Sequence, residues 1–488
     1  MRIEKIGKRV KNMKYSGKKI MCLCVAASLF LQNINISHTE KYIEVAEAAS
    51  SKKYQDITQF PESYQSKLMQ LKKKYPNWNF VRVNINLSWD SVIKNESASG
   101  VNIITSDVPG GGKSGIYSAP LSYLSTDEAV YNAYNDKYKV IDSTNRYTPD
   151  KQVVGYYMDP RNFLTEEQIF QFESLKYESN QSVEGIKQIL NGTFMSGNYT
   201  YSVKKKKNNK TVTKKVTKNY ADTFYAAGKK YKINPYLLAV RVRQEVGTTL
   251  SAATSGTYKG YKGYYNFYNI GATDSSNGTA VLKGLQYAKT KGDFGRPWNS
   301  QYKAILGGAE YIVQNYISVG QNTFYFQKFS VVKKEYRYWH QYMSNIQAAK
   351  EEAKKMYQLY QSKGMLKKAR TFRIPVYKNM PKTAVSLPKS EGSSNNYMKV
   401  IKVTSGGKKF SLVTAKNYKK KSFGLNVPNS IKRVRIIGKA SNKNAKITGC
   451  NKVYELNPGK VRTITLTVKA QNGSIRKYKV KIRRLAKK

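Results

Sequence analysis

Residues 234–247 read Asn-Pro-Tyr-Leu-Leu-Ala-Val-Arg-Val-Arg-Gln-Glu-Val-Gly. Asn234 is a favoured helix N-cap residue. Pro235 suits the first helical position, because the backbone N–H group that proline lacks would have no hydrogen-bond partner within the helix there. Gly247 is a typical residue just beyond a helix C-terminus. The stretch therefore predicts a helix that begins at Pro235 and ends immediately before Gly247.

Glu245 occupies a position in this helix where an apolar residue is expected. It continues the spacing of Leu238 and Val242, so we expect it to share their buried face. Burial and the C-terminal end of the helix dipole both favour the neutral form of a carboxyl group, which is the form that a general acid requires. The alternative is a structural carboxylate that pairs with Arg241 or Arg243.

A stretch rich in glycine and tyrosine follows the helix. Residues 256–271 hold five tyrosines interleaved with glycines and end in Asn-Phe-Tyr-Asn-Ile-Gly. Aromatic faces pack well against the apolar C–H faces of sugar rings, so this loop beside an isolated acid indicates a sugar-binding groove. The alternative is that the tyrosines only reflect composition, since the chain has 40 of them.

The surrounding region, residues 220–363, is predicted to be mainly helical. Apolar residues recur with helical spacing over 221–231, 304–316 and 346–360. Between Thr223 and Ala309 there are only three carboxylates, Glu245, Asp274 and Asp293, which makes Glu245 stand out.

The region before it, residues 49–200, mixes helical patterns with a predicted strand that includes Trp78 and Ile85. We expect an α/β accessory region. Residues 201–219 form a separate lysine-rich segment, which predicts an exposed hairpin or insert. A solvated surface is one interpretation of this hairpin, and contact with a polyanion is the other.

The C-terminal region, residues 364–488, has a different character. Apolar and polar residues alternate over 461–468 and 477–483, with the hairpin-turn pair Asn472-Gly473 between them. The region holds 33 basic and two acidic residues, a net charge of +31. An all-β sandwich with lysine on its outer faces is predicted.

The first 48 residues predict export. A basic segment, residues 1–19, precedes a short apolar segment, residues 20–31, and Ala46-Glu-Ala48 provides a cleavage site. No apolar run approaches the roughly 20 residues of a membrane helix, so no stable membrane insertion is expected. The mature chain keeps only Cys450, which cannot form an internal disulfide.

Composition restricts the partners. The chain has 86 Lys and Arg residues against 30 Asp and Glu, a net charge of +56, so it should meet polyanions. Since export argues against nucleic acid, anionic cell-wall polymers such as teichoic acids are the expected partners. Two histidines and three cysteines supply too few ligands for a structural zinc site, and neither a metal nor a cofactor is expected.

Five short motifs occur in a characteristic order. They are Gln244-Glu245-Val-Gly247, Tyr268-Asn-Ile-Gly-Ala272 with Asp274, Gly307-Gly-Ala309 before Tyr316-Ile317, Gly320-Gln-Asn-Thr323 with Tyr325, and His340-Gln-Tyr342. In this series, residues 220–350 resemble the glucosaminidase domain of bacterial peptidoglycan hydrolases, glycoside hydrolase family 73. Less specifically, the C-terminal region resembles the cadherin-like β-sandwich repeats of bacterial surface proteins.

The resemblance implies a lysozyme-like, mainly α-helical catalytic domain in a multidomain protein, between an α/β N-terminal region and an all-β C-terminal sandwich. It implies endo-β-N-acetylglucosaminidase activity, in which Glu245 protonates the leaving oxygen of the β-1,4 bond after N-acetylglucosamine. Asp274 is the candidate for positioning the attacking water; substrate assistance by the 2-acetamido group and Tyr268 are alternatives. The candidate substrate-binding residues are Gln244, Tyr265, Tyr268, Asn269, Gln321 and Tyr325.

The expected protein is therefore a secreted, wall-associated autolysin that acts on peptidoglycan glycan strands. One rival is a non-catalytic surface protein that binds wall glycan or teichoic acid; the intact Glu245 argues against it. Another is a nucleic-acid binder, which the export signal and the lack of a recognised basic reading motif oppose. The sequence leaves the oligomeric state open.

Overall fold

The structure is a computed structural model, and it describes residues 55–108, 118–142, 145–207, 210–272 and 279–486. Apart from the start of α4 (Gln55–Thr58), the elements below lie in one compact unit, Ile57–Lys488. The predicted export signal, residues 1–48, falls outside the described residues. Within the described part, no helix has the length and apolar character needed to cross a membrane.

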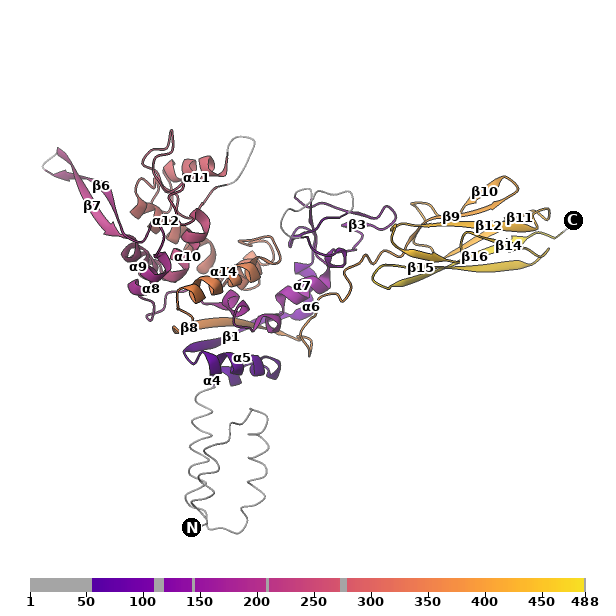
Figure 1. The fold of residues 1–488 in the computed structure, drawn as a ribbon, viewed down its shortest axis with the longest axis horizontal. Helices are drawn as coiled ribbons and strands as arrows, with labels where there is room; N and C mark the ends of the chain where they lie inside the picture. Colours follow the sequence, from indigo (N-terminus) through magenta and orange to yellow (C-terminus); the bar gives the residue numbers. More distant parts are fainter. Residues whose placement is uncertain (1–54, 109–117, 143–144, 208–209, 273–278, 487–488) are drawn as a thin grey trace, which may run out of the picture. The chain divides into compact units, whose positions relative to one another are not determined.

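A pair of parallel strands joins distant parts of the chain. β1 (Trp78–Ser88) pairs with β8 (Arg370–Lys378), with Trp78 opposite Arg370 (Figure 1). The fully buried rings of Trp78 and Phe372 pack with centroids 4.9 Å apart. The strand predicted around Trp78 is therefore present, but its partner belongs to the region expected to form part of the C-terminal sandwich. That boundary at residue 364 is wrong, because residues 370–378 complete the N-terminal sheet.

The N-terminal and helical regions also share a core. α14 (Ala348–Ser362) packs against the short helix η3 (Gln168–Phe172). Beside them, Arg370 and Glu173 form a buried ion pair at 2.6 Å. Residues 49–200 are thus not a free-standing accessory region in this structure.

A bundle of short helices carries the residues of interest. Helices α8, α9 and α10 contact one another, and α12 contacts α9. The helices predicted over 221–231 and 346–360 correspond to α9 and α14. The one predicted over 304–316 is α-helical only in its first part and continues as a π-helix. The bounds are α8 Val183–Leu190, α9 Tyr220–Tyr231, α10 Pro235–Val246, α11 Ala280–Lys289, α12 Gln301–Ile312, π-helix Val313–Ile317 and α13 Phe324–Lys328.

The lysine-rich segment forms the predicted hairpin. β6 (Asn198–Lys207) pairs antiparallel with β7 (Lys210–Asn219), and Asn198 lies opposite Asn219. The hairpin thus begins three residues before the expected boundary at 201. It leads directly into α9.

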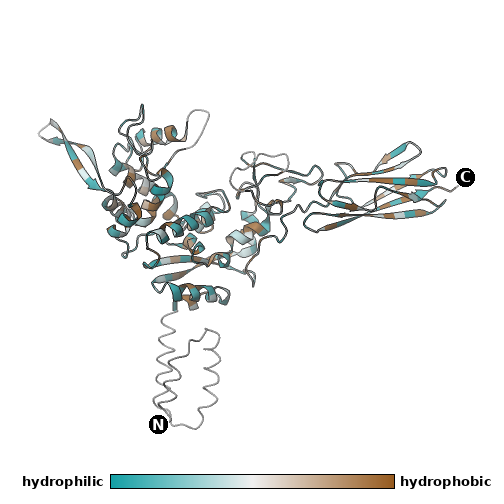
Figure 2. Ribbon diagram, viewed as in Figure 1, coloured by the Kyte–Doolittle hydropathy of each residue, from teal (hydrophilic) through white to brown (hydrophobic). Residues whose placement is uncertain are grey.

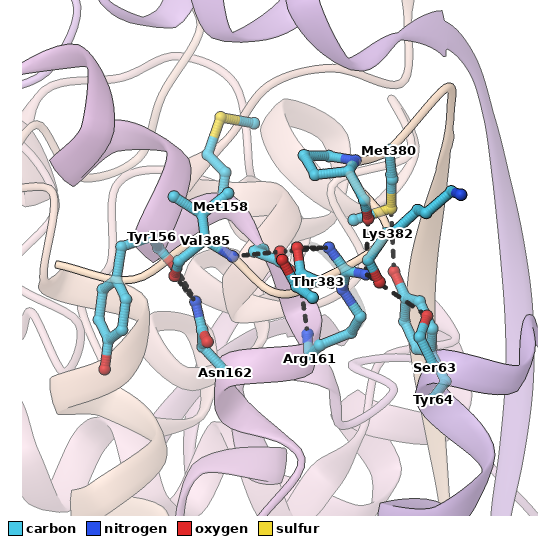
Figure 3. Close-up of polar contacts among 12 residues, drawn as sticks. Ser63, Tyr64, Tyr156, Met158, Arg161, Asn162, Met380, Lys382, Thr383 and Val385 are labelled. Carbon is cyan, nitrogen blue, oxygen red and sulfur yellow. Dashed lines mark hydrogen bonds and ion pairs between the residues drawn. The ribbon is translucent and has the colours of Figure 1, made fainter.

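A buried ion pair fixes the segment that follows β8, residues 380–386, which we call the strap. Asp159 and Arg161 form a two-pronged contact of 2.9 and 2.7 Å, and they are 0% and 3% exposed. Arg161 also donates to the strap carbonyl oxygens of residues 381–383, and Asp159 accepts from the N–H group of Val385 (Figure 3). Two side chains of the N-terminal region therefore bind the backbone of the strap, which lies more than 200 residues later in the sequence.

Residues 398–484 form two four-stranded sheets around one core. The sheet orders are β10-β9-β12-β14 and β11-β16-β15-β13, and apolar side chains from both fill a common cluster. Figure 2 shows hydrophilic and hydrophobic residues alternating along these strands. The predicted hairpin is β15 (Val461–Lys469) with β16 (Ile475–Arg484). The other strands are β9 Met398–Ser405, β10 Lys408–Ser411, β11 Ser422–Val427, β12 Arg433–Ala440, β13 Lys446–Thr448 and β14 Lys452–Glu455.

The smaller elements complete the N-terminal and connecting regions. They are α4 Gln55–Thr58, α5 Glu62–Lys74, α6 Trp89–Glu96, α7 Lys151–Met158, β2 Ile104–Thr105, β3 Tyr131–Asn132, β4 Lys137–Tyr138, β5 Arg146–Tyr147 and the 3-10 turns Leu121–Tyr123, Pro160–Phe163 and Lys334–Tyr336.

Candidate active site

Helix α10 begins and ends where its sequence predicts. The Asn234 side chain accepts hydrogen bonds from the N–H groups of Tyr236 and Leu237, at 2.9 and 3.3 Å. Gly247 ends the helix with a φ of 79°, a conformation that glycine adopts without strain. These local interactions fix the register of the helix and hence the position of Glu245.

Glu245 is exposed, which contradicts the prediction that it shares the buried face of α10. Leu238 and Val242 are fully buried, as predicted. The residues that follow the last turn, 247–250, are however exposed. The face of α10 that holds Leu238 and Val242 is therefore no longer covered by other residues at the position of Glu245. The expected desolvation of Glu245 is absent, and its carboxylate is instead accessible to a ligand.

Asn269 brings the tyrosine-rich loop to Glu245. Its Nδ2 donates to the backbone oxygen of Glu245 at 3.0 Å and to the carboxylate Oε2 at 3.2 Å. Asn269 has a φ of 50°, which asparagine tolerates better than most residues. Buried Tyr268 and Ile270 on either side anchor the loop. The sequence-predicted residues Glu245 and Asn269 are thus in direct contact.

Arg241 is a buried cation one turn before Glu245. Its guanidinium lies 4.6 Å from the ring centre of Tyr342, and Nη2 donates to Gln327 at 3.3 Å. Burial opposes the charged form, yet the electrostatic effect of Tyr342, followed by those of Glu352 and Glu245, raises the pKa of Arg241. Arg241 therefore stays positively charged beside the carboxylate.

A series of aromatic rings leads from Arg241 to an exposed tryptophan. Ring centroids are 4.9 Å apart for Tyr342 and Tyr316, 5.2 Å for Tyr316 and His340, and 5.5 Å for His340 and Trp339. The Trp339 side chain is 66% exposed. An exposed indole is unusual for so large an apolar group, and it can stack on a ligand ring.

Three predicted substrate-binding residues are buried. Tyr268 is 4% exposed, and burial raises its pKa well above the usual range. Tyr325 is fully buried and contacts Met158 and Tyr377 through its hydroxyl. Gln321 is 1% exposed and bonds to His340. Each of them fills the core in this structure, and their contact with substrate stays a prediction.

The remaining predicted residues have different positions. Gln244 is exposed beside Glu245. Tyr265 is half-buried, and its ring lies so close to Gly256 that a Cβ atom there would be 2.5 Å away. Asp274 lies outside the described residues. Burial lowers the pKa of His340.

The described residues contain no group of three or more His, Cys, Asp or Glu side chains that could hold a metal ion. Trp339 was not among the predicted binding residues, because the sequence gives no signal for its exposure. Arg241 was considered only as an ion-pair partner of Glu245.

Curated relatives resemble part of this chain. It is 32% identical over 173 residues to a bifunctional autolysin of Staphylococcus epidermidis, which covers 34% of this chain and 12% of the relative. It is 31% identical over 240 residues to a β-N-acetylglucosaminidase of Bacillus subtilis, which covers 46% of this chain and 23% of the relative. The matched segments are thus less than a quarter of these relatives. No family model matches.

Solved structures give weaker likenesses. A major bifunctional autolysin has a TM-score of 0.39 at 21% identity, over 61% of this chain and 98% of that one. A catalytic mutant of Staphylococcus aureus autolysin E in complex with the disaccharide NAG-NAM has a TM-score of 0.36 at 20% identity, over 60% and 99%. By sequence, the relatives of this chain are autolysins and a glucosaminidase, and these two matches cover 34% and 46% of its residues.

Proposed function

We propose that this chain is a secreted peptidoglycan hydrolase of the glycoside hydrolase 73 type, which cleaves the β-1,4 bond after N-acetylglucosamine with Glu245 as general acid. The observation that carries the proposal is the exposed Glu245 carboxyl at the end of α10, held by Asn269 from the tyrosine-rich loop. The resemblance of the chain to autolysins and a glucosaminidase supports the same activity.

Glu245 would donate its proton to the glycosidic oxygen as the bond to the anomeric carbon breaks. A glycan strand that covers this carboxyl would exclude water, and loss of water favours the protonated form needed for that step. Water then attacks the oxocarbenium-like carbon. Asp274 or the substrate's own 2-acetamido oxygen is the proposed second group. Tyr268 drops out because its hydroxyl is buried.

Trp339 is the proposed sugar-stacking residue of this site. It is exposed at the end of the ring series that starts at Arg241. Two of the tyrosines that the sequence predicts as binding residues, Tyr268 and Tyr325, are buried, whereas Trp339 offers an exposed ring. Gln244, Tyr265 and Asn269 remain candidates for contact with the glycan.

Trp339→Ala should raise KM for polymeric peptidoglycan about two- to tenfold and leave kcat within about twofold, since such ring contacts are worth about 0.5–1.5 kcal/mol. Steady-state kinetics on solubilised glycan strands measure both constants. Trp339→Phe, which keeps an aromatic face, should restore most of the affinity. An unchanged KM for Trp339→Ala would remove Trp339 from the site.

Asn269→Gly should lower kcat about tenfold with little change in thermal midpoint. Glycine accepts the positive φ of this position, so the change removes only the hydrogen bonds to Glu245, and a bond to a charged group is worth about 1.5–3 kcal/mol. Asn451→Gly is the matched control, because Asn451 also has a positive φ, of 58°, but lies in the two-sheet region. Equal kcat values for the two variants would show that Asn269 does not position Glu245.

Two further parts of the proposal concern retention at the wall. The two-sheet region, residues 398–484, is proposed to be a cadherin-like sandwich, and its charge to hold the enzyme on anionic wall polymers such as teichoic acids. Electrostatic retention of this kind weakens as salt increases.

The proposal is tested by digesting purified peptidoglycan, reducing the products with borohydride and identifying the reduced ends by mass spectrometry. New reduced N-acetylglucosamine ends are expected. Reduced N-acetylmuramic acid ends would make the protein a muramidase instead. No cleavage, with the protein still bound to sacculi, would favour the non-catalytic binding protein.

A further inference from the structure

One outer face of the two-sheet region carries a straight row of positive charges. In β16, the exposed residues alternate with Tyr478, Val480 and Ile482, which are fully buried. The exposed positions between them form what we call the cationic row, which consists of Lys477, Lys479, Lys481 and Arg483. Successive charged residues are about 6.8 Å apart along the strand, since each residue advances about 3.4 Å.

Short polar side chains flank the cationic row on both sides. On β15, Thr467, Thr465 and Thr463 lie directly opposite Lys477, Lys479 and Lys481, and the apolar Val461 lies opposite Arg483. On β11, the parallel neighbour, Ser422, Gly424 and Asn426 pair with Lys479, Lys481 and Arg483. The long cationic side chains therefore extend further from the sheet than the shorter side chains beside them. Several of these neighbours have hydroxyl or amide groups that can form hydrogen bonds.

The sheet that carries the cationic row has no acidic residues in its strands to neutralise the row. The four strands β11, β16, β15 and β13 contain no Asp or Glu. Within the described part of the chain, none of the four cations of the row has a carboxylate partner. Four adjacent, unpaired cations repel one another, and an anionic ligand would relieve that repulsion.

We propose that the cationic row binds a linear polymer of polyol phosphate units, which lies along β16 with one phosphate at each cation. This inference rests on the proposed function, because it names the chemistry and the place of the wall contact. Six covalent bonds separate neighbouring phosphorus atoms in a glycerol phosphate chain. An extended peptide spans about 3.3–3.6 Å over three bonds, so six bonds span about 7 Å, which matches the spacing of the row.

A single-stranded nucleic acid has a similar phosphate spacing, but the face is unsuited to its bases. Proteins that bind single strands supply aromatic rings on which the bases stack. The positions that flank the row carry Thr, Ser, Gly and Asn, with one apolar residue, Val461, opposite Arg483. None of them is aromatic, and the aromatic residue of β16, Tyr478, is buried on the opposite side. The face thus recognises phosphate charge and hydroxyl groups without a platform for bases.

The test compares two variants of the full chain that lose equal charge. The row variant replaces Lys477, Lys479, Lys481 and Arg483 with Gln. The control variant replaces Lys402, Arg435, Lys439 and Lys452 with Gln, which are exposed residues of the other sheet. The probes are end-labelled poly(glycerol phosphate) and oligothymidylate with the same number of phosphates, measured by fluorescence anisotropy over a salt series.

The row variant should bind poly(glycerol phosphate) at least tenfold more weakly than the wild type, and the control variant within threefold. The slope of log affinity against log salt should fall by about three for the row variant, because four phosphate contacts on a single-stranded polyanion contribute about 0.7 each. A Lys477→Arg, Lys479→Arg, Lys481→Arg variant should bind as the wild type does, which separates loss of charge from misfolding.

Equal losses in the row and control variants would overturn the proposal, because bulk charge would then explain binding. Row-dependent binding of oligothymidylate as tight as that of poly(glycerol phosphate) would also overturn it. Hydrolysis of peptidoglycan stripped of phosphate polymers is measured in parallel on all variants. The row variant should keep wild-type hydrolysis, whereas failure of the wild type to hydrolyse would count against the proposed function and leave the binding result intact.

Discussion

Glu245→Gln is expected to lower kcat for peptidoglycan hydrolysis by a factor of about 10² to 10⁴, the usual contribution of general acid catalysis. The amide has the shape of the carboxyl group but cannot supply its proton. Its oxygen can still accept the hydrogen bond that Asn269 donates to Oε2 in the wild type, so the loop should keep its position. The loss should therefore fall on kcat, with KM and binding to sacculi nearly unchanged.

The matched control is Glu310→Gln, the same chemical change in α12 of the same helical bundle. Glu310 contacts Tyr231 and Gln314 at the surface and has no proposed role in catalysis. Activity of Glu310→Gln should stay within twofold of the wild type. If Glu245→Gln also retains activity within twofold, another residue supplies the proton and the assignment of Glu245 is wrong.

Local signals in the sequence were sufficient to predict α10. Asn234, Pro235 and Gly247 act on backbone groups within a few residues of themselves. The exposure of Glu245 could not be predicted in this way, because a periodic pattern gives the side of a helix and not the elements that cover it. The periodic pattern also does not predict the contact between Glu245 and Asn269, although the sequence predicts both as site residues.

The domain boundaries show the same limit on a larger scale. β8 was assigned to the C-terminal region by its position after the helices, yet it pairs with β1. Nothing local links two parallel strands that far apart in sequence. Burial of Tyr325 follows from this arrangement, since its hydroxyl contacts Tyr377 of β8 and Met158 of α7.

Alternation in the C-terminal strands, by contrast, was a reliable signal. A period of two places successive residues on opposite faces, so the pattern of residues 477–483 separates the buried apolar set from the exposed cations. What the pattern lacked was the neighbouring strand. The threonines opposite the lysines come from the register of β15 with β16, which the Asn472-Gly473 turn makes plausible but does not determine.

Arg161→Met should lower the free energy of unfolding by about 3–5 kcal/mol, the range for removing one partner of a buried ion pair. The variant leaves the Asp159 carboxylate buried without its cation, and the strap loses the donor to the carbonyl oxygens of residues 381–383 (Figure 3). Urea unfolding followed by tryptophan fluorescence measures the loss. The control is Arg146→Met, because Arg146 and Asp142 form an exposed pair of 43% and 41% exposure, and exposed pairs contribute about 0–1 kcal/mol.

A double-mutant cycle separates the ion pair from the strap. Asp159→Leu with Arg161→Met removes both charges, and replacing a buried pair by apolar residues is often close to neutral. The double variant should therefore be more stable than Arg161→Met alone, and the two single losses should not add. The loss of unfolding free energy that remains in the double variant measures the contribution of the bonds to the strap. Residues 381–383 of the strap are exposed, so in the variant they can bind water in place of Arg161. Arg161→Lys should be intermediate, because lysine keeps the charge but not the planar fork that contacts both carboxylate oxygens. If the losses of the two single variants simply add, Asp159 and Arg161 act independently, and the ion pair between them does not contribute to the free energy of unfolding.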